Sequence, residues 1–570
     1  MSAADPVTTE IVRNFVTSCA EDMNAALWRS AYSAVIYEGR DSAVALLDAE
    51  GNMLGQSTGV PLFVGAIDAC VHHVLDYYGD DIAADDIFIM NDSYMQGTHL
   101  HDITAIGPIF FEGNLEGFGA ARAHWGDIGA IDPGSTMGST NIYQEGLRLG
   151  PTRIVKDGQP IREWYDHLRL NTRIPDASIG DLNAQIASIR TGQRRLKQLL
   201  NRIGAETYRS ACKNIFEQAR RLDREAISRL ADGTYSRDGF LDDDGIGDQP
   251  VKIALSLTIK GEEMIIDLAG TSGPVEGSVN CGAVQTKSLL RLAYKTMINP
   301  DRAITGGSFE TMTVNIPDNC LFNAQEPAAC EWYFTGLGLL ADLMISCMSE
   351  AMPNRATAAH YGDSMVACFF SVDPNRGQWI AIEPTAGGWG GRADGDGESA
   401  LINLVNGGFR NIPAEVYETK FPVRVEEFSI RRDSGGPGRW RGGCGVVRNY
   451  KLLESCFGAL WFDRSKTTAW GLNGGSEGKG PENKIIFPDG KIERPLKMRA
   501  RELPPGTVVE TATGGGGGYG NPKSRRLEDV VADVRQGFVS IESAWSHYGA
   551  KIGPGIEANE SLSETRAALN

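Results

Sequence analysis

The stretch that decides the fold of this chain is a short apolar run followed at once by a polar loop, Ile87-Phe88-Ile89-Met90-Asn91-Asp92-Ser93-Tyr94-Met95-Gln96-Gly97-Thr98-His99-Leu100-His101-Asp102. The four apolar residues, ended by Asn and Asp, predict a short buried strand. Apolar runs broken by Gly continue through residues 103–123 and predict two more strands, which end at Arg122-Ala123-His124. The stretch therefore predicts a sheet with His and Asp side chains where its strands begin and end.

Upstream of this stretch, residues 8–33 are predicted to form an amphipathic helix with Thr8 or Thr9 as its cap. Its apolar side chains recur at intervals of four, at Ile11, Phe15, Cys19, Met23 and Leu27. The apolar run at 43–47 then predicts a strand, and the turn sequence after it predicts a returning strand. Asp41, just before this run, is expected at the mouth of a strand.

Downstream, the pattern alternates between helix and strand. It predicts helices at 64–79, 180–231, 284–298 and 335–352, a hairpin at 249–270, a Gly-rich strand region at 380–520 and a last polar helix at 526–546. The predicted fold class is therefore α+β, with several mixed or antiparallel sheets, flanking helices and Gly-rich loops.

The length of 570 residues exceeds what one hydrophobic core organises, so several domains are expected. The predicted regions are a metal-binding N-terminal α+β region at 1–245, a central α+β region at 246–380, a Gly-rich β region at 381–525, and a C-terminal helix and tail at 526–570. The chain has 68 glycines among its 570 residues, a larger share than the usual value of about 7%. This excess favours a loop-rich enzyme over a helical bundle.

Composition excludes several classes of partner. The net charge of −18 repels phosphate backbones, so no nucleic acid is expected to bind. No run approaches the roughly 18 apolar residues that a membrane span requires, so no membrane association is expected. Ten Cys without a CxxC pair, behind an N-terminus that lacks a secretory signal, predict reduced thiols and a cytoplasmic location.

Three of the eight histidines lie between positions 99 and 124, beside several aspartates. Imidazole and carboxylate groups next to Gly-bearing turns are what a divalent-metal site needs. His99 and Asp102 share a face if the segment is a helical turn, whereas His99 and His101 share one if it is a strand, and the sequence does not choose. Core or loop histidines without a metal are an equally weighted alternative.

Other candidate residues carry weaker signals. Asp92, Asp127 and Asp132 are interpreted as turn formers or as partners that orient the His rings. Cys281 is interpreted as a buried turn residue. The glycine run Gly514 to Gly518 is interpreted as a structural loop, because no Gly-Lys-Ser/Thr follows it. No Walker A sequence and no GxSxG nucleophile elbow, in which the motif joins a strand to a helix, is found, which disfavours nucleotide hydrolysis by this chain alone and serine-esterase chemistry.

Several strings together resemble the hydantoinase B / 5-oxoprolinase family over residues 5–548. They are Asp5-Pro6-Val7-Thr8-Thr9-Glu10-Ile11-Val12, Asn91-Asp92, Gly97-Thr98-His99-Leu100-His101-Asp102, Ala123-His124-Trp125-Gly126-Asp127, Gly277-Ser278-Val279-Asn280-Cys281, Asp433-Ser434-Gly435-Gly436-Pro437-Gly438-Arg439-Trp440-Arg441-Gly442-Gly443, and Gly514 to Gly520 with Asn521-Pro522. Within this family the chain is most similar to the β-subunit branch of ATP-dependent caprolactamase-type lactam hydrolases.

The resemblance implies a divalent metal, zinc or manganese, held by Asp41, His99, Asp102 and His124, with His101 as a neighbour. It also implies a partner, a hydantoinase A-type subunit that binds ATP-Mg, and an (αβ)₂ heterotetramer is the expected assembly. The expected substrates are lactams, hydantoins or 5-oxoproline, with caprolactam the best candidate. Bicarbonate is a possible further cofactor.

The expected mechanism is ATP activation of the amide by the partner, followed by attack of metal-bound hydroxide in this chain. Asp127 or a ligand carboxylate is expected to accept the second proton, and Trp125, Tyr94 or Phe63 to line an apolar pocket. Two alternatives stay open at this point. One is a subunit of an ATP-dependent acetone- or acetophenone-type carboxylase, and the other is a non-catalytic scaffold for the ATPase subunit.

Overall fold

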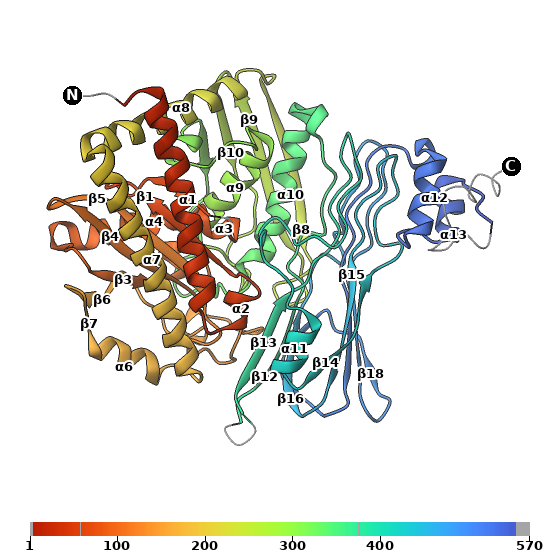
Figure 1. The fold of residues 1–570 in the computed structure, drawn as a ribbon. Coiled ribbons are helices and arrows are strands. Elements are labelled where there is room, and N and C mark those ends of the chain that lie inside the picture. Colours follow the sequence, from red (N-terminus) through yellow and green to blue (C-terminus); the bar gives the residue numbers. More distant parts are fainter. Residues whose placement is uncertain (1–3, 58, 374–376, 554–570) are drawn as a thin grey trace.

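The computed structural model describes residues 4–57, 59–373 and 377–553. It confirms a mixed α+β chain in which four sheets are flanked by helices (Figure 1). The N-terminal half forms one side of the view, and the Gly-rich strands and the C-terminal helices lie on the other.

The first sheet has seven strands, all antiparallel to their neighbours, in the order β2-β1-β5-β4-β3-β6-β7. They are β1 (Ser42–Leu47), β2 (Met53–Gln56), β3 (Ile87–Met90), β4 (Asp102–Phe111), β5 (Asn114–His124), β6 (Thr152–Lys156) and β7 (Gln159–Pro160). Ser42 pairs with Ala123, and Asp102 pairs with His124. This register brings the starts of β1 and β4 to the end of β5, so residues 41, 102 and 124 meet at one end of the sheet.

Two long helices, α1 (Pro6–Ser30) and α7 (Pro175–Ile203), pack together on one face of this sheet, with α8 (Ala205–Ile227) beside α1. The cap of α1 is Asp5, whose carboxylate accepts the Thr8 N–H at 2.9 Å, so the prediction of Thr8 or Thr9 as cap was wrong. Pro6 at the first helical position starts the helix earlier than expected.

The buried stripe of α1 is also shifted from the predicted one. Ile11 is 52% exposed, whereas Val12 and Val16 are fully buried with Cys19, Met23 and Leu27. Both series of apolar residues fit a helical period at the start of α1, and the partner α7 decides between them. Gly192 of α7 lies so close to Met23 that a Cβ there would be 2.5 Å from its sulfur.

A layer of helices separates the first sheet from the second. The second sheet has the order β11-β10-β9-β8. Its strands are β8 (Gly233–Leu241), β9 (Val251–Lys260), β10 (Glu263–Asp267) and β11 (Met312–Asn315), and the helices of the layer are α3 (Pro61–Val64), α4 (Ile67–Tyr78), α5 (Ser93–Gln96), α9 (Ala283–Met297) and α10 (Tyr333–Ala351). Among the described residues α10 alone has the length and apolar composition of a membrane span, but most of it is buried in this core.

Two antiparallel sheets in the C-terminal half share a third core. Their orders are β13-β12-β16-β19 and β14-β15-β20-β17-β18. The strands are β12 (Val366–Ser371), β13 (Trp379–Pro384), β14 (Val423–Ile430), β15 (Val446–Leu452), β16 (Cys456–Trp461), β17 (Glu482–Ile486), β18 (Ile492–Glu493), β19 (Lys497–Leu503) and β20 (Val508–Ala512). Other helices are α2 (Ala34–Tyr37), α6 (Arg162–Leu170), α11 (Ala414–Lys420), α12 (Leu527–Arg535) and α13 (Ile541–Ser543).

The glycine-rich strings form a stack of extended segments bonded backbone to backbone. The N–H of Gly516 donates to the carbonyl of Gly443, and the N–H of Gly443 donates to the carbonyl of Trp389. A Cβ on Gly388 would lie 2.0 Å from the Gly443 oxygen, and a Cβ on Gly516 would lie 2.0 Å from the Trp389 oxygen. Only Gly fits such contacts. The run at 514–518 therefore has the structural role that the sequence indicated.

A substitution in this stack is predicted to destabilise the protein. Gly516→Ala forces backbone segments apart, because no flexible side chain lines the space. We expect a loss of at least about 1–3 kcal/mol of unfolding free energy, measured by denaturant titration.

The matched control is Gly247→Ala, where the added Cβ meets its nearest atom only at 3.6 Å, an ordinary contact. Equal stability of the two variants would contradict the close-packed stack.

Candidate metal centre

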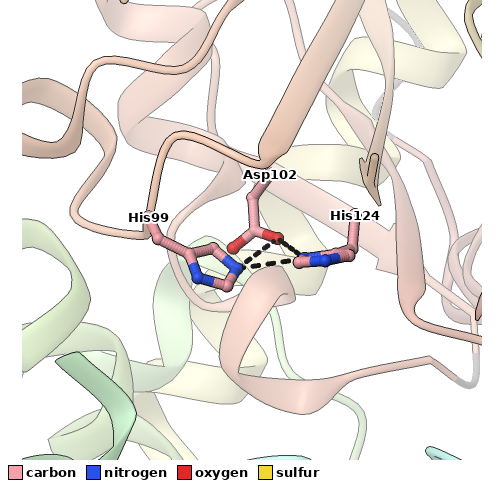
Figure 2. Close-up of side chains that lie close together, drawn as sticks. All are labelled: His99, Asp102 and His124. Atoms are coloured by element: carbon pink, nitrogen blue, oxygen red, sulfur yellow. Dashed lines mark hydrogen bonds and ion pairs between the residues drawn. The ribbon is translucent and has the colours of Figure 1, made fainter. Parts of the chain in front are cut away.

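Three buried side chains meet where β4 begins and β5 ends (Figure 2). His99 Nε2 lies 3.1 Å and His124 Nδ1 lies 3.3 Å from the same oxygen of Asp102, Oδ1. The two imidazole nitrogens are 3.1 Å apart. Donor atoms of two rings and one carboxylate that converge in this way can hold a single cation.

The local backbone explains the convergence. Asp102 and His124 face each other as paired residues of β4 and β5. His99 is placed by the turn at Gly97, whose φ of +88° favours glycine. A Cβ at Gly97 would also lie 2.4 Å from the backbone nitrogen of Gln285 in α9. The His99–Asp102 segment is thus a turn leading into a strand, and His99 has both Asp102 and His101 near it.

Asp41 lies next to this group, directly before β1. Its backbone oxygen accepts the His124 N–H at 3.1 Å, and its carboxyl is buried with Oδ1 free of hydrogen-bond partners in the described part of the chain. Burial raises the pKa of Asp41 to about 6, with His124 opposing the shift and Asp102 adding to it. Three of the predicted ligands, His99, Asp102 and His124, therefore converge, and Asp41 lines the same pocket as the two histidines.

Glu331 is a member of the cluster that sequence reasoning missed. Its Oε1 lies 3.3 Å from His99 Nδ1 and 3.4 Å from His101 Nδ1. The ring of His101 stacks on that of His124, with centroids 5.3 Å apart. The one available signal was an acidic residue between Cys330 and Trp332, directly before an apolar helix. His99, His101 and Glu331 form a second possible ligand group that shares His99 with the first.

The carboxylate and imidazole groups of this cluster stabilise one another's charged forms. Burial alone would raise the pKa of Asp102, but His99 and His124 lower it well below its usual range. Burial likewise opposes ionisation of Glu331, and His101 and His99 lower its pKa in spite of that. Burial would lower the pKa of His99, yet Asp102 and Glu331 raise it well above its usual value.

Buried polar atoms without a hydrogen-bond partner show whether these residues fit a cation. Within the described residues, Asp41 Oδ1, His124 Nε2 and both carboxylate oxygens of Glu331 are buried without a hydrogen-bond partner. Each such atom costs free energy unless an ion or a polar group satisfies it. A mixed set of imidazole nitrogens and carboxylate oxygens suits zinc or manganese. The residues present therefore fit a divalent cation.

Glu145 supports the cluster from behind. Its carboxyl accepts the backbone N–H groups of Cys330 at 2.9 Å and Glu331 at 3.0 Å. Burial, followed by the nearby charge of Glu331, raises the pKa of Glu145 to about 8. This carboxyl thus fixes the backbone that presents Glu331.

Asp127, predicted as a proton acceptor, has its contacts elsewhere. Its carboxylate pairs with the Arg173 guanidinium at 2.6 Å and accepts the Thr172 hydroxyl at 3.2 Å. The structure does not bring it into contact with the cluster, so its role stays a prediction. Asp92 caps α5 by accepting the Tyr94 N–H at 2.8 Å, as a turn former does.

An inner pocket opens beside the cluster and is lined by Asp41, His99 and His124. Its other walls are Val35, Val60, Leu62, Phe63, Ser135, Trp332, Tyr333, Phe334, Ser364, Val366, Ile382, Pro384, Val405 and Asn406. Phe63 lines it as expected, whereas Trp125 donates to Gln185 and Tyr94 donates to the carbonyl of Ala328 outside it. No Lys or Arg is among its described lining residues, which suits a neutral, largely apolar ligand.

Comparison with known proteins gives the family. The family model described as hydantoinase B/oxoprolinase matches residues 5–522. A protein of Methanocaldococcus jannaschii is 32% identical over 554 residues, which are 96% of each chain. The caprolactamase subunit beta of Pseudomonas jessenii is 28% identical over 588 residues, 100% of each chain.

Solved structures agree. The crystal structure of the ATP-dependent caprolactamase from Pseudomonas jessenii matches with a TM-score of 0.91 at 28% identity, covering 100% of both chains. The nucleotide-free structure of an acetone carboxylase matches with a TM-score of 0.90 at 20% identity, covering 99% of this chain and 82% of the other, which shows the fold alone. With a family model that spans most of its length, the chain belongs to the hydantoinase B/oxoprolinase family.

Proposed function

We propose that this chain is the metal-binding subunit of a two-component, ATP-dependent cyclic-amide hydrolase, with caprolactam as the best candidate substrate. The observation that carries the proposal is the convergence of His99, Asp102 and His124 beside a largely apolar pocket that Asp41, His99 and His124 line. The likeness to a caprolactamase subunit over the whole chain supports it.

Activation by ATP answers a chemical difficulty. Resonance makes an amide a poor electrophile, and opening an unstrained ring gains little free energy. Transfer of the ATP γ-phosphate to the amide oxygen leaves ADP and a phosphorylated imidate. One water adds to its carbon, the C–N bond breaks, and a second water releases phosphate, which leaves the ring-opened amino acid. We assign the phosphate transfer to a hydantoinase A-type partner and expect an (αβ)₂ assembly.

This chain's residues then have distinct tasks. A divalent cation, when bound by Asp41, His99, Asp102 and His124, would lower the pKa of a water molecule and polarise the reacting centre. The partnerless oxygen of Asp41 can accept a proton from the attacking water. The Tyr333 hydroxyl lies 3.5 Å from Asp102 Oδ2 and lines the pocket, so it can deliver a proton to the ring nitrogen. Phe63, Trp332 and their apolar neighbours exclude bulk water.

A carboxylase is the second candidate, and the shared fold with an acetone carboxylase favours it. In that reaction a ketone would gain a carboxyl group from bicarbonate. Formation of a carboxylated product together with a requirement for bicarbonate would decide for it. Bicarbonate stimulation alone would not, because a carboxyphosphate can also activate a lactam.

Ligand substitutions are predicted to remove metal and ring opening together. Asp41→Ala, His99→Ala and His124→Ala each delete a donor, and we expect bound metal to fall at least about tenfold, with ring opening falling in parallel. The measurements are elemental analysis and ATP-dependent lactam opening after co-expression with the ATPase subunit. His72→Ala on the exposed side of α4 is the matched control. Full ring opening by a metal-free variant would refute the proposed role.

Metal uptake is predicted to release protons near neutral pH. Because Asp102 and Glu331 raise the pKa of His99 against the effect of burial, the metal-free protein carries a proton there that a cation must displace. Apparent metal affinity should therefore keep rising with pH above 7 and should weaken as pH falls. Titration calorimetry in buffers of different ionisation enthalpy measures the proton count. Uptake without proton release would show that His99 is neutral or not a ligand.

A further inference from the structure

A second cleft lies on the other side of the loops that carry Asp41. We name it the Arg40 cleft; it is lined by Trp28, Arg40, Gly59, Phe409 and Arg410, among others, and has a volume of about 400 Å³. Four chain segments supply residues to both this cleft and the inner pocket, namely Arg40 and Asp41, Gly59 and Val60, Ala386 and Pro384, and Gly408 and Asn406. The wall between the two spaces is therefore made of these four segments.

The segments of this wall contact one another directly. The Arg410 N–H donates to the Gly39 carbonyl at 2.8 Å. A Cβ on Gly408 would lie 2.6 Å from the Gly59 oxygen, so these two backbones touch. The cleft thus begins where the inner pocket ends, one residue away from a predicted metal ligand.

Two arginines give this cleft its charge. The Arg40 guanidinium lies 4.2 Å from the centre of the Trp28 ring, which holds it in place. Neither Arg40 nor Arg410 forms an ion pair within 4.0 Å of an acidic side chain in the described part of the chain, and none of the described lining residues carries a carboxylate; the charge of Glu38 acts on Arg40 from outside the lining. In a protein of net charge −18, two guanidinium groups that share a cleft without an acid provide a place for an anion.

The backbone at Arg40 adopts an uncommon conformation that the surrounding turn holds in place. Its φ is +60°, which a residue with a side chain rarely adopts. The turn is held by the Asp41 N–H on the Val35 carbonyl at 3.0 Å and by the Ser42 N–H on the Arg40 carbonyl at 2.8 Å. As a result Asp41 lines the inner pocket while Arg40 lines the cleft.

Size separates the two spaces. The inner pocket has a volume of about 40 Å³, against about 400 Å³ in the Arg40 cleft. The cleft has room for a phosphate with its bound water. The apolar faces of Trp28 and Phe409 beside the guanidinium groups suit a ligand that joins an apolar ring to a phosphate.

We propose that the Arg40 cleft is a phosphate-binding site, with Arg40 and Arg410 as its charge partners, which docks the phosphorylated amide as a whole, ring and phosphate together, on the outer side of the wall that carries Asp41. Paired guanidinium groups bind phosphate oxygens through charge-assisted hydrogen bonds. The identity of the ligand rests on the proposed function, whereas the binding of phosphate does not.

The first test uses inorganic phosphate and the full-length chain with its metal. Titration calorimetry should show phosphate binding to the wild type, and Arg40→Gln with Arg410→Gln should weaken it about tenfold or more. Arg162→Gln on α6 is the matched control, because its side chain is 89% exposed and far along the chain. Arg40→Gly is a second variant, since Gly adopts the positive φ without strain and keeps the fold. Equal phosphate binding by the wild type and the double variant would overturn the proposal.

The second test uses the assembled enzyme. The double variant should keep its metal and its assembly with the ATPase subunit, while more ADP forms for each ring opened, because the activated amide is captured less well. If the wild-type enzyme shows no metal-dependent ring opening, the proposed function is wrong, but the phosphate binding measured in the first test is unaffected. If the double variant binds phosphate as well as the wild type but fails to assemble with the ATPase subunit, the cleft docks acidic side chains of the partner. This outcome would also overturn the proposal.

Discussion

The burial of charged side chains away from solvent is the constraint on which this structure depends. The carboxyl groups of Asp41, Asp102 and Glu331 are buried near three imidazole rings, where an isolated carboxylate is strongly disfavoured. Their negative charge is offset there by protonated histidine or by a cation, and their orphaned oxygens are consistent with the second. The surrounding elements serve to keep these groups at a fixed separation.

The sheet provides that separation through register alone. Strands β1, β4 and β5 are neighbours, and a shift of one residue in either pairing would turn Asp102 or His124 to the opposite face. The turn before α10 adds Glu331 from a distant part of the chain, and Glu145 fixes the backbone that carries it. The cluster is thus held by two kinds of contact, ladder bonds within the sheet and carboxylate bonds to a loop.

The sequence predicted the elements well wherever a local pattern decides them. The apolar runs of β3, β4 and β5 are set by neighbouring residues, so histidines and aspartates could be expected where these strands begin and end, whereas the choice of Asp102 beside His99 came from family likeness. The burial of Val12 in place of Ile11 could not, because packing against α7 chose between two equally apolar stripes. Glu331 escaped notice because its partners lie more than two hundred residues away in the chain.

Asp41 illustrates the other limit of sequence reasoning. Its position before a strand was visible, but its assignment as a ligand came from family likeness and not from spacing. In the structure its backbone oxygen accepts the His124 N–H, which places Asp41 next to His124 through a contact between strands that spacing does not show.

The glycine stack has a consequence for how such chains are compared. At Gly515, Gly516, Gly517 and Gly518 a carbonyl oxygen of a neighbouring segment stands about 2 Å from where a Cβ would lie, so the geometry itself requires glycine there. A match between chains in this run therefore reports a shared backbone arrangement and carries no information about the substrate. Differences in substrate have to be sought among the residues that line the inner pocket, such as Phe63 and Asn406.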